Sequence, residues 1–176
     1  MARTPSGTVA SIATQFASAL NFTAATNATE TVLTVAGATL VAGDLVEVTS
    51  SWSKISGRIY RIKTATATAL TLEGCNTTSL AQFPAGAGTG SVRKIMTWLQ
   101  VSQKLNLEAS GGDAKTVNYT YVETGDEQTI FDGFTATSYM VDLDADAVGS
   151  VPYEQLKTLT DSNTVTALRL VAASGA

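Results

Sequence analysis

Residues 91–107 read SVRKIMTWLQVSQKLNL and alternate in polarity over their whole length. Side chains at odd positions from Ile95 to Leu107 are mostly apolar, and those at even positions from Lys94 to Asn106 are mostly polar. Successive side chains of a β-strand point to opposite faces, so this period of two predicts a strand half buried on a core. The stretch is much longer than the usual strand of about five or six residues. It predicts either one long strand in a large or shared sheet, or two ordinary strands with a bend near Gln103.

The composition favours a folded, strand-rich chain. Its 176 residues suffice for one good core, alone or with a small second domain. A hydrophobic fraction of 44% excludes a disordered chain, and no apolar run approaches the ~20 residues of a membrane helix. Thr, Ala, Val and Ser dominate over Lys and Glu, which favours strands and turns over helices. We therefore expect a soluble, mainly β protein without a membrane partner.

Export and disulfide bonding are not indicated. The first residues, MARTPSGTVAS, contain no apolar block of signal-peptide length. Cys75 is the single cysteine, so an internal disulfide is excluded. This usage fits synthesis in a reducing compartment.

A run of short, evenly spaced strands is predicted between Thr31 and Ser91. The segments are TVLTVAG, DLVEVTS, GRIYRIKT and ALTLEG, with turn residues between them. Strands at spacings of about 8 to 12 residues are typical of a small antiparallel barrel or sandwich. We interpret residues 24–90 as a small all-β insert, and residues 1–23 with 91–176 as the core domain.

The two parts differ in charge. Residues 24–94 hold six cationic and four acidic side chains, a balance of +2. Residues 95–176 hold four cationic and eleven acidic side chains, a balance of −7. An acidic excess of this kind opposes affinity for nucleic acid. The basic side chains from Lys54 to Lys63 are divided between two faces of a predicted strand, which indicates a solvated barrel surface.

Further strands are predicted on both sides of this segment. They cover residues 7–14, 20–23, 116–123, 128–134, 136–143 and 165–172. One helix is predicted at about residues 151–160, because Ser150 is a cap candidate, Pro152 suits the first turn and Glu154 suits the positive helix end. The sequence thus predicts a mainly β fold: an antiparallel β-sandwich or barrel with one flanking α-helix and a small barrel-like insert.

No catalytic or cofactor site is indicated. The absence of histidine excludes His-based triads and zinc sites. Cys75 has no histidine to activate it, so we interpret it as a structural or incidental thiol. The loop from Gly86 to Gly90 is glycine-rich like a phosphate loop, but it leads into a strand and lacks the Lys-Ser/Thr of a nucleotide loop. We expect neither an enzyme nor a bound cofactor.

Asp142, Asp144 and Asp146 begin like a calcium loop, with acids at alternate positions. The sixth position, which needs glycine, holds Ala147, and the twelfth, which needs a bidentate glutamate, holds Tyr153. These mismatches favour solvated acids at a strand end, just before a helix start that favours negative charge. No metal site is expected.

Several stretches together are similar to one family. They are PSGTVASIATQF at residues 5–16, AGDLVEVTSSW at 42–52, GRIYRI at 57–62, FPAGAGTGSVRK at 83–94, MTWLQV at 96–101 and SYMVDLDADAVGSVPYEQLKTLTDSN at 138–163. In sequence and order they resemble the tail tube proteins of long-tailed bacteriophages. The resemblance spans nearly the whole chain, although none of the stretches is a catalytic signature.

This resemblance implies a β-sandwich flanked by one helix, in subunits that form hexameric rings stacked into a hollow tube for DNA delivery. It implies transient passage of DNA without specific binding, and a place in the virion tail after synthesis in the bacterial host cytoplasm. The partners would be other copies of the chain and tail proteins such as the tape measure, tail terminator and distal tail proteins. Members usually continue beyond the strand equivalent to residues 167–173 with a further pair of strands. We therefore expect either a neighbour that completes the sheet or a shortened chain.

In the same family an N-terminal arm and a long loop bridge neighbouring rings. By position, residues 1–7 match the arm, and residues 108–115 and 124–132 are both candidates for the loop. The candidate inter-ring contacts are Arg3, Thr4, Pro5, Glu108, Asp113, Lys115 and Asp126. The insert would then decorate the outer surface.

The acidic excess suggests what the tube wall would be like. Each Lys or Arg contact to a phosphate releases counterions and adds salt-sensitive affinity, which would retard sliding DNA. We hypothesise that acids of the core domain line the lumen. The candidates are Glu123, Glu127, Asp142 and Asp144. The alternative is that these acids keep the outer surface soluble.

Two other classes stay open. A virion or cell-surface β-sandwich that binds carbohydrate would need an aromatic face, for which Trp52, Tyr60 and Trp98 are the candidates. A hydrolase with two carboxylates would use Asp142 with Asp144, or Asp126 with Glu127. Open sheet edges in a chain with little charge favour association instead, since they need to be covered. The self-assembling tube protein is therefore the preferred interpretation.

Overall fold

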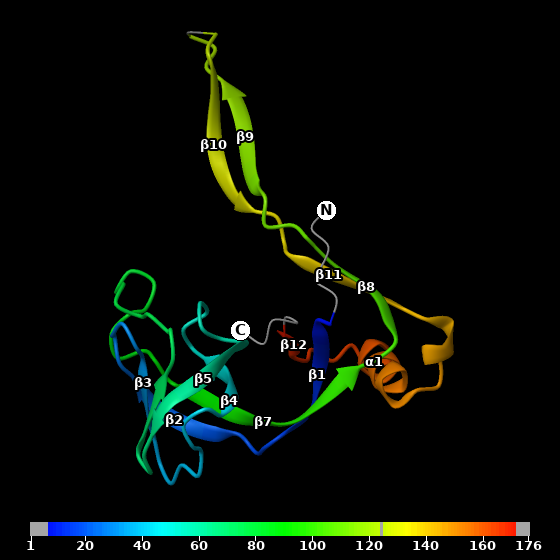
Figure 1. Ribbon diagram of the computed structural model, residues 1–176. Coiled ribbons are helices and arrows are strands. Elements are labelled where there is room, and N and C mark those ends of the chain that lie inside the picture. Colours follow the sequence, from blue (N-terminus) through cyan, green and yellow to red (C-terminus); the bar gives the residue numbers. More distant parts are fainter. Residues whose placement is uncertain (1–6, 124, 172–176) are drawn as a thin grey trace. The chain divides into compact units, whose positions relative to one another are not determined.

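The computed structural model describes residues 7–123 and 125–171 (Figure 1). Their strands are β1 (Val9–Phe16), β2 (Leu20–Ala25), β3 (Val32–Val35), β4 (Leu45–Ser50), β5 (Arg58–Ala65), β6 (Ala69–Leu72), β7 (Gly90–Val101), β8 (Lys104–Ser110), β9 (Ala114–Thr120), β10 (Glu127–Phe134), β11 (Ser138–Leu143) and β12 (Leu168–Val171). Their helices are the short 3-10 helix η1 (Ala145–Ala147) and the α-helix α1 (Val151–Asp161). The predictions of a mainly β fold and of a helix near residues 151–160 are confirmed.

The chain divides into two compact units. The barrel unit comprises Ser11–Leu99 and Asp161–Arg169. The ribbon unit comprises Met1–Ala10, Gln100–Thr160 and Leu170–Ala176. The sequence predicted an insert of residues 24–90 in a core domain, with boundaries that differ from those of the two units. That division stays a prediction.

Six strands close into an antiparallel barrel. Their order is β7-β2-β3-β6-β5-β4, and the pairing of β4 with β7 closes the ring (Figure 1). The four strands predicted between Thr31 and Ser91 are present as β3, β4, β5 and β6, so the predicted small barrel is confirmed. β2 and β7, which flank these strands in the sequence, complete it.

Gly90 lies where the barrel closes. It pairs with Phe22 on β2 and also with Ser50 on β4, so two strands approach it from opposite sides. A Cβ atom at this position would lie 2.0 Å from the carbonyl oxygen of Thr49. Only glycine fits such a close approach of two backbones.

The barrel interior is filled from alternate positions of its strands. Val46 and Val48 on β4, and Leu70 and Leu72 on β6, are fully buried, as a period of two requires. The buried core consists of Phe22, Leu33, Val35, Val46, Val48, Trp52, Ile55, Ile62, Leu70, Leu72, Cys75, Phe83 and Val92. This continuous apolar interior stabilises the barrel through the hydrophobic effect.

Cys75 belongs to that interior. Its side chain is buried, and its Sγ atom accepts a hydrogen bond from Thr31 Oγ1 at 3.3 Å. The same Thr31 hydroxyl lies 2.8 Å from the Cys75 carbonyl oxygen. The thiol is therefore a packed, structural group.

The sheet continues from β7 to β1 and then to β12. Ala13, Ile95 and Ala167 form a second, smaller buried cluster, against which Phe16 and Trp98 pack. Thr166 supports it through a hydrogen bond from its Oγ1 to the carbonyl oxygen of Ala13, at 2.6 Å.

The alternating stretch of residues 91–107 forms two strands. β7 ends at Val101 and β8 begins at Lys104. Between them Gln103 has a φ of 54°, in the left-handed region that no strand continues through. The sequence left two arrangements open, and the second of them, two strands with a bend near Gln103, is confirmed.

The ribbon unit contains two separate two-stranded sheets and α1. β8 pairs with β11 and β9 pairs with β10, each antiparallel. Helix α1 starts as predicted, with the Glu154 N–H donating to the Ser150 carbonyl at 3.0 Å. Both helices in the described part of the chain are too short or too polar to cross a membrane.

Candidate assembly surface

Between Val117 and its turn, the hairpin of β9 and β10 has one apolar and one polar face. Val117 lies directly opposite Ile130, and Tyr119 and Tyr121 follow Val117 at alternate positions. Because alternate residues share a face, these side chains lie on the same side of the hairpin. Val117 is 52% exposed and Ile130 is 54% exposed. The apolar face is thus open to solvent.

The opposite face is held together by polar side chains. Asn118 Nδ2 donates to Glu127 Oε1 at 2.7 Å, and Thr129 Oγ1 donates to Asn118 Oδ1 at 3.0 Å. These bonds link the two strands on the side away from Val117. The hairpin is therefore amphipathic like a strand pair that lies on a core, although within the described residues it forms a sheet of its own.

Further exposed apolar groups lie at both ends of the hairpin. At the turn, Val122 is fully exposed. At the base, the register shifts between Phe131 and Gly133, and the Phe131 and Phe134 rings meet edge to face with their centroids 5.0 Å apart. These rings lie opposite Thr116 and Ala114, on the face away from Val117, and both are more than half exposed. We define the assembly surface as the exposed apolar residues of both faces: Val117, Tyr121, Val122, Ile130, Phe131 and Phe134.

Such a surface is unusual for a lone hairpin. A two-stranded hairpin by itself is only marginally stable in water, and stability requires further strands or packing of the apolar face. Large exposed apolar patches mark sites of association. The hairpin therefore has the chemistry of a docking element.

The ribbon of β8 and β11 also combines exposed apolar side chains with polar ones. Leu107 is buried opposite Val141, whereas Leu105, Tyr139 and Met140 are more than half exposed. On the polar side, Ser110 and Ser138 share a hydrogen bond of 2.7 Å. These residues extend the exposed apolar area of the ribbon unit beyond the hairpin.

The two ribbons are joined by a short, well-bonded connection. The Thr135 N–H donates to the Asp113 carbonyl at 2.9 Å, and the Gly112 N–H donates to the Thr135 carbonyl at 3.1 Å. Gly111 has a φ of 91°, and a Cβ there would lie 2.0 Å from the Ala136 carbonyl oxygen. The bridging loop predicted over residues 108–115 is therefore shorter than expected, because strand pairing takes up all but residues 111–113.

The candidate inter-ring residues lie in different places. Arg3, Thr4 and Pro5 are outside the described residues. Glu108 is on β8 and accepts a hydrogen bond from Asn106 Nδ2 at 2.8 Å, and Lys115 is exposed on β9.

Asp113 and Asp126 lie at opposite ends of the hairpin. Asp113 belongs to the connection at its base, and Asp126 to the turn at its tip, where its carbonyl accepts from the Tyr121 N–H at 3.4 Å. The second predicted loop, residues 124–132, ends earlier than expected because β10 already begins at Glu127. Of the candidate contacts, Asp113, Lys115 and Asp126 lie on or beside the hairpin, and their role between rings stays a prediction.

The four candidate lumen acids are all exposed and all belong to the ribbon unit. Glu123 lies in the hairpin turn, and Asp142 lies on β11 opposite Asn106. Glu127 is bonded to Asn118, as described above. Asp144 caps η1, since its carboxylate accepts from the Asp146 N–H at 3.1 Å. Two of the four thus have a local structural role as well.

The aromatic candidates for a carbohydrate-binding face do not share one. Trp52 is 2% exposed, with its Nε1 donating to the Pro84 carbonyl at 3.2 Å. Trp98 packs in the second cluster, with the guanidinium of Arg169 at 4.6 Å from its ring centroid. Tyr60 lines a pocket of the barrel unit.

The assembly surface was missed by sequence reasoning. The alternation of Val117, Tyr119 and Tyr121 was visible, and a strand was predicted over residues 116–123. What the alternation does not show is whether the face that these side chains share is covered by the same chain. The exposed fractions supply that information, because within the described residues nothing buries the hairpin's apolar side.

Comparisons with known proteins identify one family. Residues 50–175 match the model of a family described as "Phage tail tube protein, TTP". No curated protein and no solved structure gave a significant match.

Proposed function

This chain belongs to the phage tail tube protein family, and from that premise we propose that it assembles into stacked hexameric rings that form a tube for DNA delivery. As a member of this family it is a structural component of the phage virion tail, in a family that is not catalytic in general. The observation that carries the proposal of self-assembly is the exposed apolar face of the β9–β10 hairpin.

The free energy gained by burying the assembly surface supports the proposal. Full burial of a side chain such as Val, Ile or Phe contributes about 1.5 to 3 kcal/mol. The six residues of the assembly surface are each at least half exposed, so covering them contributes several kcal/mol in total. Association itself costs about 4 to 15 kcal/mol. One hairpin contact is therefore weak, whereas a closed ring gives every subunit two contacts and stacking adds more.

Ring closure would also cover the unpaired strand edges of the two ribbons. A two-stranded sheet leaves both of its edges with unpaired backbone groups, and such edges pair readily with other strands. In a closed ring the same surface can be covered on every subunit by the symmetry-related partner. Tape measure, tail terminator and distal tail proteins are the further partners that a tube of this kind would meet.

The charge distribution fits passage of DNA without retention. The four candidate lumen acids are exposed and carry no cationic partner in the described ion pairs. An acidic wall makes no counterion-releasing contacts to phosphate, so it adds no drag. We propose that these acids face the lumen and that the segment of residues 24–90 faces outward.

The test is assembly as a function of concentration, with two neighbouring variants. Val117→Lys places a charge opposite Ile130 on the apolar face, and Thr120→Lys places the same charge on the other face of the same strand, opposite Glu127. Negative-stain imaging and light scattering should show rings or tubes for the wild type and for Thr120→Lys, and monomers for Val117→Lys. A wild type that stays monomeric at high concentration, or a Val117→Lys variant that assembles like Thr120→Lys, would refute the proposal.

A further inference from the structure

A pocket of about 280 Å³ lies on the barrel unit. Its polar lining is contributed by Lys54, Arg58, Tyr60, Asn76 and Gln82, and the buried side chain of Phe83 also lines it. Lys54 lies in the turn after β4, Arg58 and Tyr60 are on β5, and Asn76 and Gln82 follow β6. The pocket is thus built by three separate parts of the barrel.

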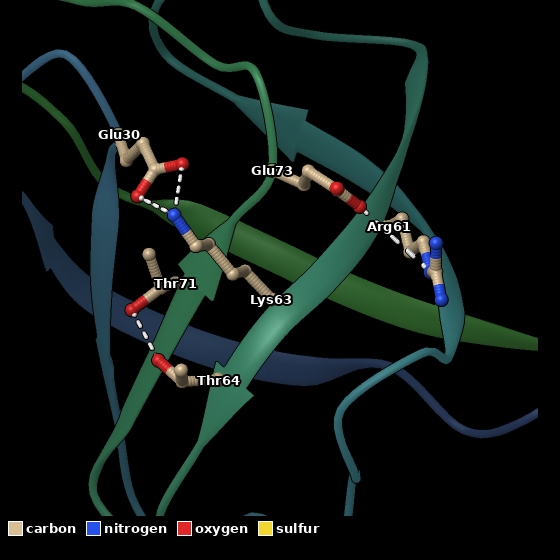
Figure 2. Close-up of polar contacts among 6 residues, drawn as sticks. All are labelled: Glu30, Arg61, Lys63, Thr64, Thr71 and Glu73. Carbon is tan, nitrogen blue, oxygen red and sulfur yellow. Dashed lines mark hydrogen bonds and ion pairs between the residues drawn. The ribbon is translucent and has the colours of Figure 1, made fainter.

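The charge of the barrel is concentrated at this pocket. Residues 24–94 hold six cations and four acids. Every acid is paired with a different cation: Arg61 with Glu73 at 3.7 Å, Lys63 with Glu30 at 2.7 Å, Arg93 with Glu47 at 2.6 Å and Lys94 with Asp44 at 2.7 Å. Figure 2 shows the first two of these pairs on the barrel surface.

Two cations remain, Lys54 and Arg58, and both line the pocket. Among the residues that the structure describes, neither has a carboxylate within ion-pair distance. The balance of +2 that the sequence shows for residues 24–94 is therefore located at one site.

The alternation of β5 explains why Arg58 is there. Arg58, Tyr60 and Ile62 share one face of the strand, and Ile62 is buried in the barrel core. Arg58 therefore lies on the core-facing side at the very start of β5, while Arg61 and Lys63 point to the other side and meet their acids (Figure 2).

Tyr60 contributes a neutral hydroxyl. Burial is the main reason that the pKa of Tyr60 is raised to about 12, with the neighbouring Cys75 adding to the rise and Arg58 opposing it. The phenol is protonated at neutral pH. The charge of the pocket is thus that of Lys54 and Arg58 alone.

We propose that this pocket binds a compact organic anion, a sugar-sized molecule that carries a carboxylate or a phosphate. Arg58 and Lys54 neutralise the anionic group, and a guanidinium binds such groups with two parallel hydrogen bonds. The amides of Asn76 and Gln82 and the phenol of Tyr60 are suited to ligand hydroxyl groups. The volume is just below the roughly 300 to 1,000 Å³ of sites for drug-sized ligands, so the ligand is small. This inference does not depend on ring assembly.

Isothermal titration with four probes tests the proposal: glucuronate, glucose 6-phosphate, neutral glucose and inorganic phosphate. The two sugar anions should bind the wild type at millimolar concentrations, glucose should bind much more weakly, and the comparison of the two anions identifies the preferred group. The double variant Lys54→Gln/Arg58→Gln should bind the preferred anion about tenfold more weakly or worse, because it loses charge-assisted hydrogen bonds.

Arg61→Gln is the matched control, since it removes one positive charge from the same strand outside the pocket. It should leave binding unchanged within about twofold. Lys54 and Arg58 are exposed, so the double variant should fold normally, which urea denaturation verifies. Absence of binding by both sugar anions, equal binding of glucose, equal binding of inorganic phosphate, or an unaffected double variant would each overturn the proposal.

Discussion

Arg93 Nε lies 2.6 Å from Glu47 Oε2, and the two residues are directly opposite each other on β7 and β4, the pair of strands that closes the barrel. The guanidinium of Arg93 also lies over the ring of Phe16, at 4.1 Å from the ring centroid. One side chain thus links the seam of the barrel to the strand β1 beside it. Charge pairing and a cation–π contact act here on the same group.

Glu47→Gln should lower the free energy of unfolding by about 1 kcal/mol, because it removes the charge from a partly exposed pair with good geometry. The side chains of Arg93 and Glu47 are 41% and 21% exposed. The comparison is Glu30→Gln, which breaks the more exposed pair with Lys63 and should cost less. Urea denaturation of both variants measures the difference, and equal effects would contradict a special role of the seam.

Asp44 should make the stability of the barrel sensitive to acid. Burial, the largest single influence, raises the pKa of Asp44, but the hydrogen bond from Lys94, the Val41 N–H and the charge of Lys94 together hold it below its ordinary value of 3.8. A lowered folded-state pKa means that the stabilisation is fully present above the unfolded-state pKa and is lost as pH falls through the folded-state value.

Asp44→Asn should therefore be less stable than the wild type at neutral pH, by about 1 kcal/mol. The difference should shrink as the pH falls below about 4, because the wild type then loses the same charge. Denaturation midpoints at several pH values test this. A difference that stays constant down to the acid range would show that the charge of Asp44 is not the cause.

Gly90→Ala should prevent normal closure of the barrel. The new Cβ would meet the Thr49 carbonyl at 2.0 Å, so one backbone has to move, and we expect a loss of about 3 kcal/mol or failure to fold. Gly57→Ala is the control, because Gly57 also has a positive φ, of 70°, but open space around it. It should cost about 1 kcal/mol for the backbone strain alone. Similar losses in both variants would argue against the steric explanation.

Much of the fold follows from periodicity that the sequence displays. The period of two in residues 91–107, and the turn spacing between Thr31 and Ser91, are consequences of side chains that alternate between core and solvent. The helix start at Ser150 was visible for the same kind of local reason, since its cap and first turn are encoded in adjacent residues. Local signals of this type need no knowledge of the rest of the chain.

Other features depend on distant parts of the chain and were not visible. The choice between one long strand and two strands with a bend near Gln103 stayed open, because a non-glycine residue carries the bend. The pairing of β4 with β7 and the burial of Trp52 result from barrel closure. Lys54 and Arg58 can be identified as the two cations of residues 24–94 without an ion pair only when the four ion pairs of the folded chain are known. Exposure of the hairpin's apolar face is likewise a property of the folded chain.

The hypothesis that acids line the lumen is tested more cleanly by replacing two of the four candidate acids than by replacing all four. Glu127 bonds to Asn118 and Asp144 caps η1, so their replacement would also disturb folding. Glu123 and Asp142 are exposed and are the better targets. The double variant Glu123→Lys/Asp142→Lys reverses their charge, and Glu123→Gln/Asp142→Asn merely neutralises it.

If these acids line the tube, the lysine variant should assemble but deliver DNA slowly or incompletely, because each lysine can bind a phosphate and release counterions. The neutral variant should deliver DNA nearly as the wild type does. Lysine tubes should also retain short DNA in a manner that falls steeply with salt, which separates lumen binding from defects in assembly. Normal delivery by particles that carry the lysine variant would place Glu123 and Asp142 away from the path of the DNA.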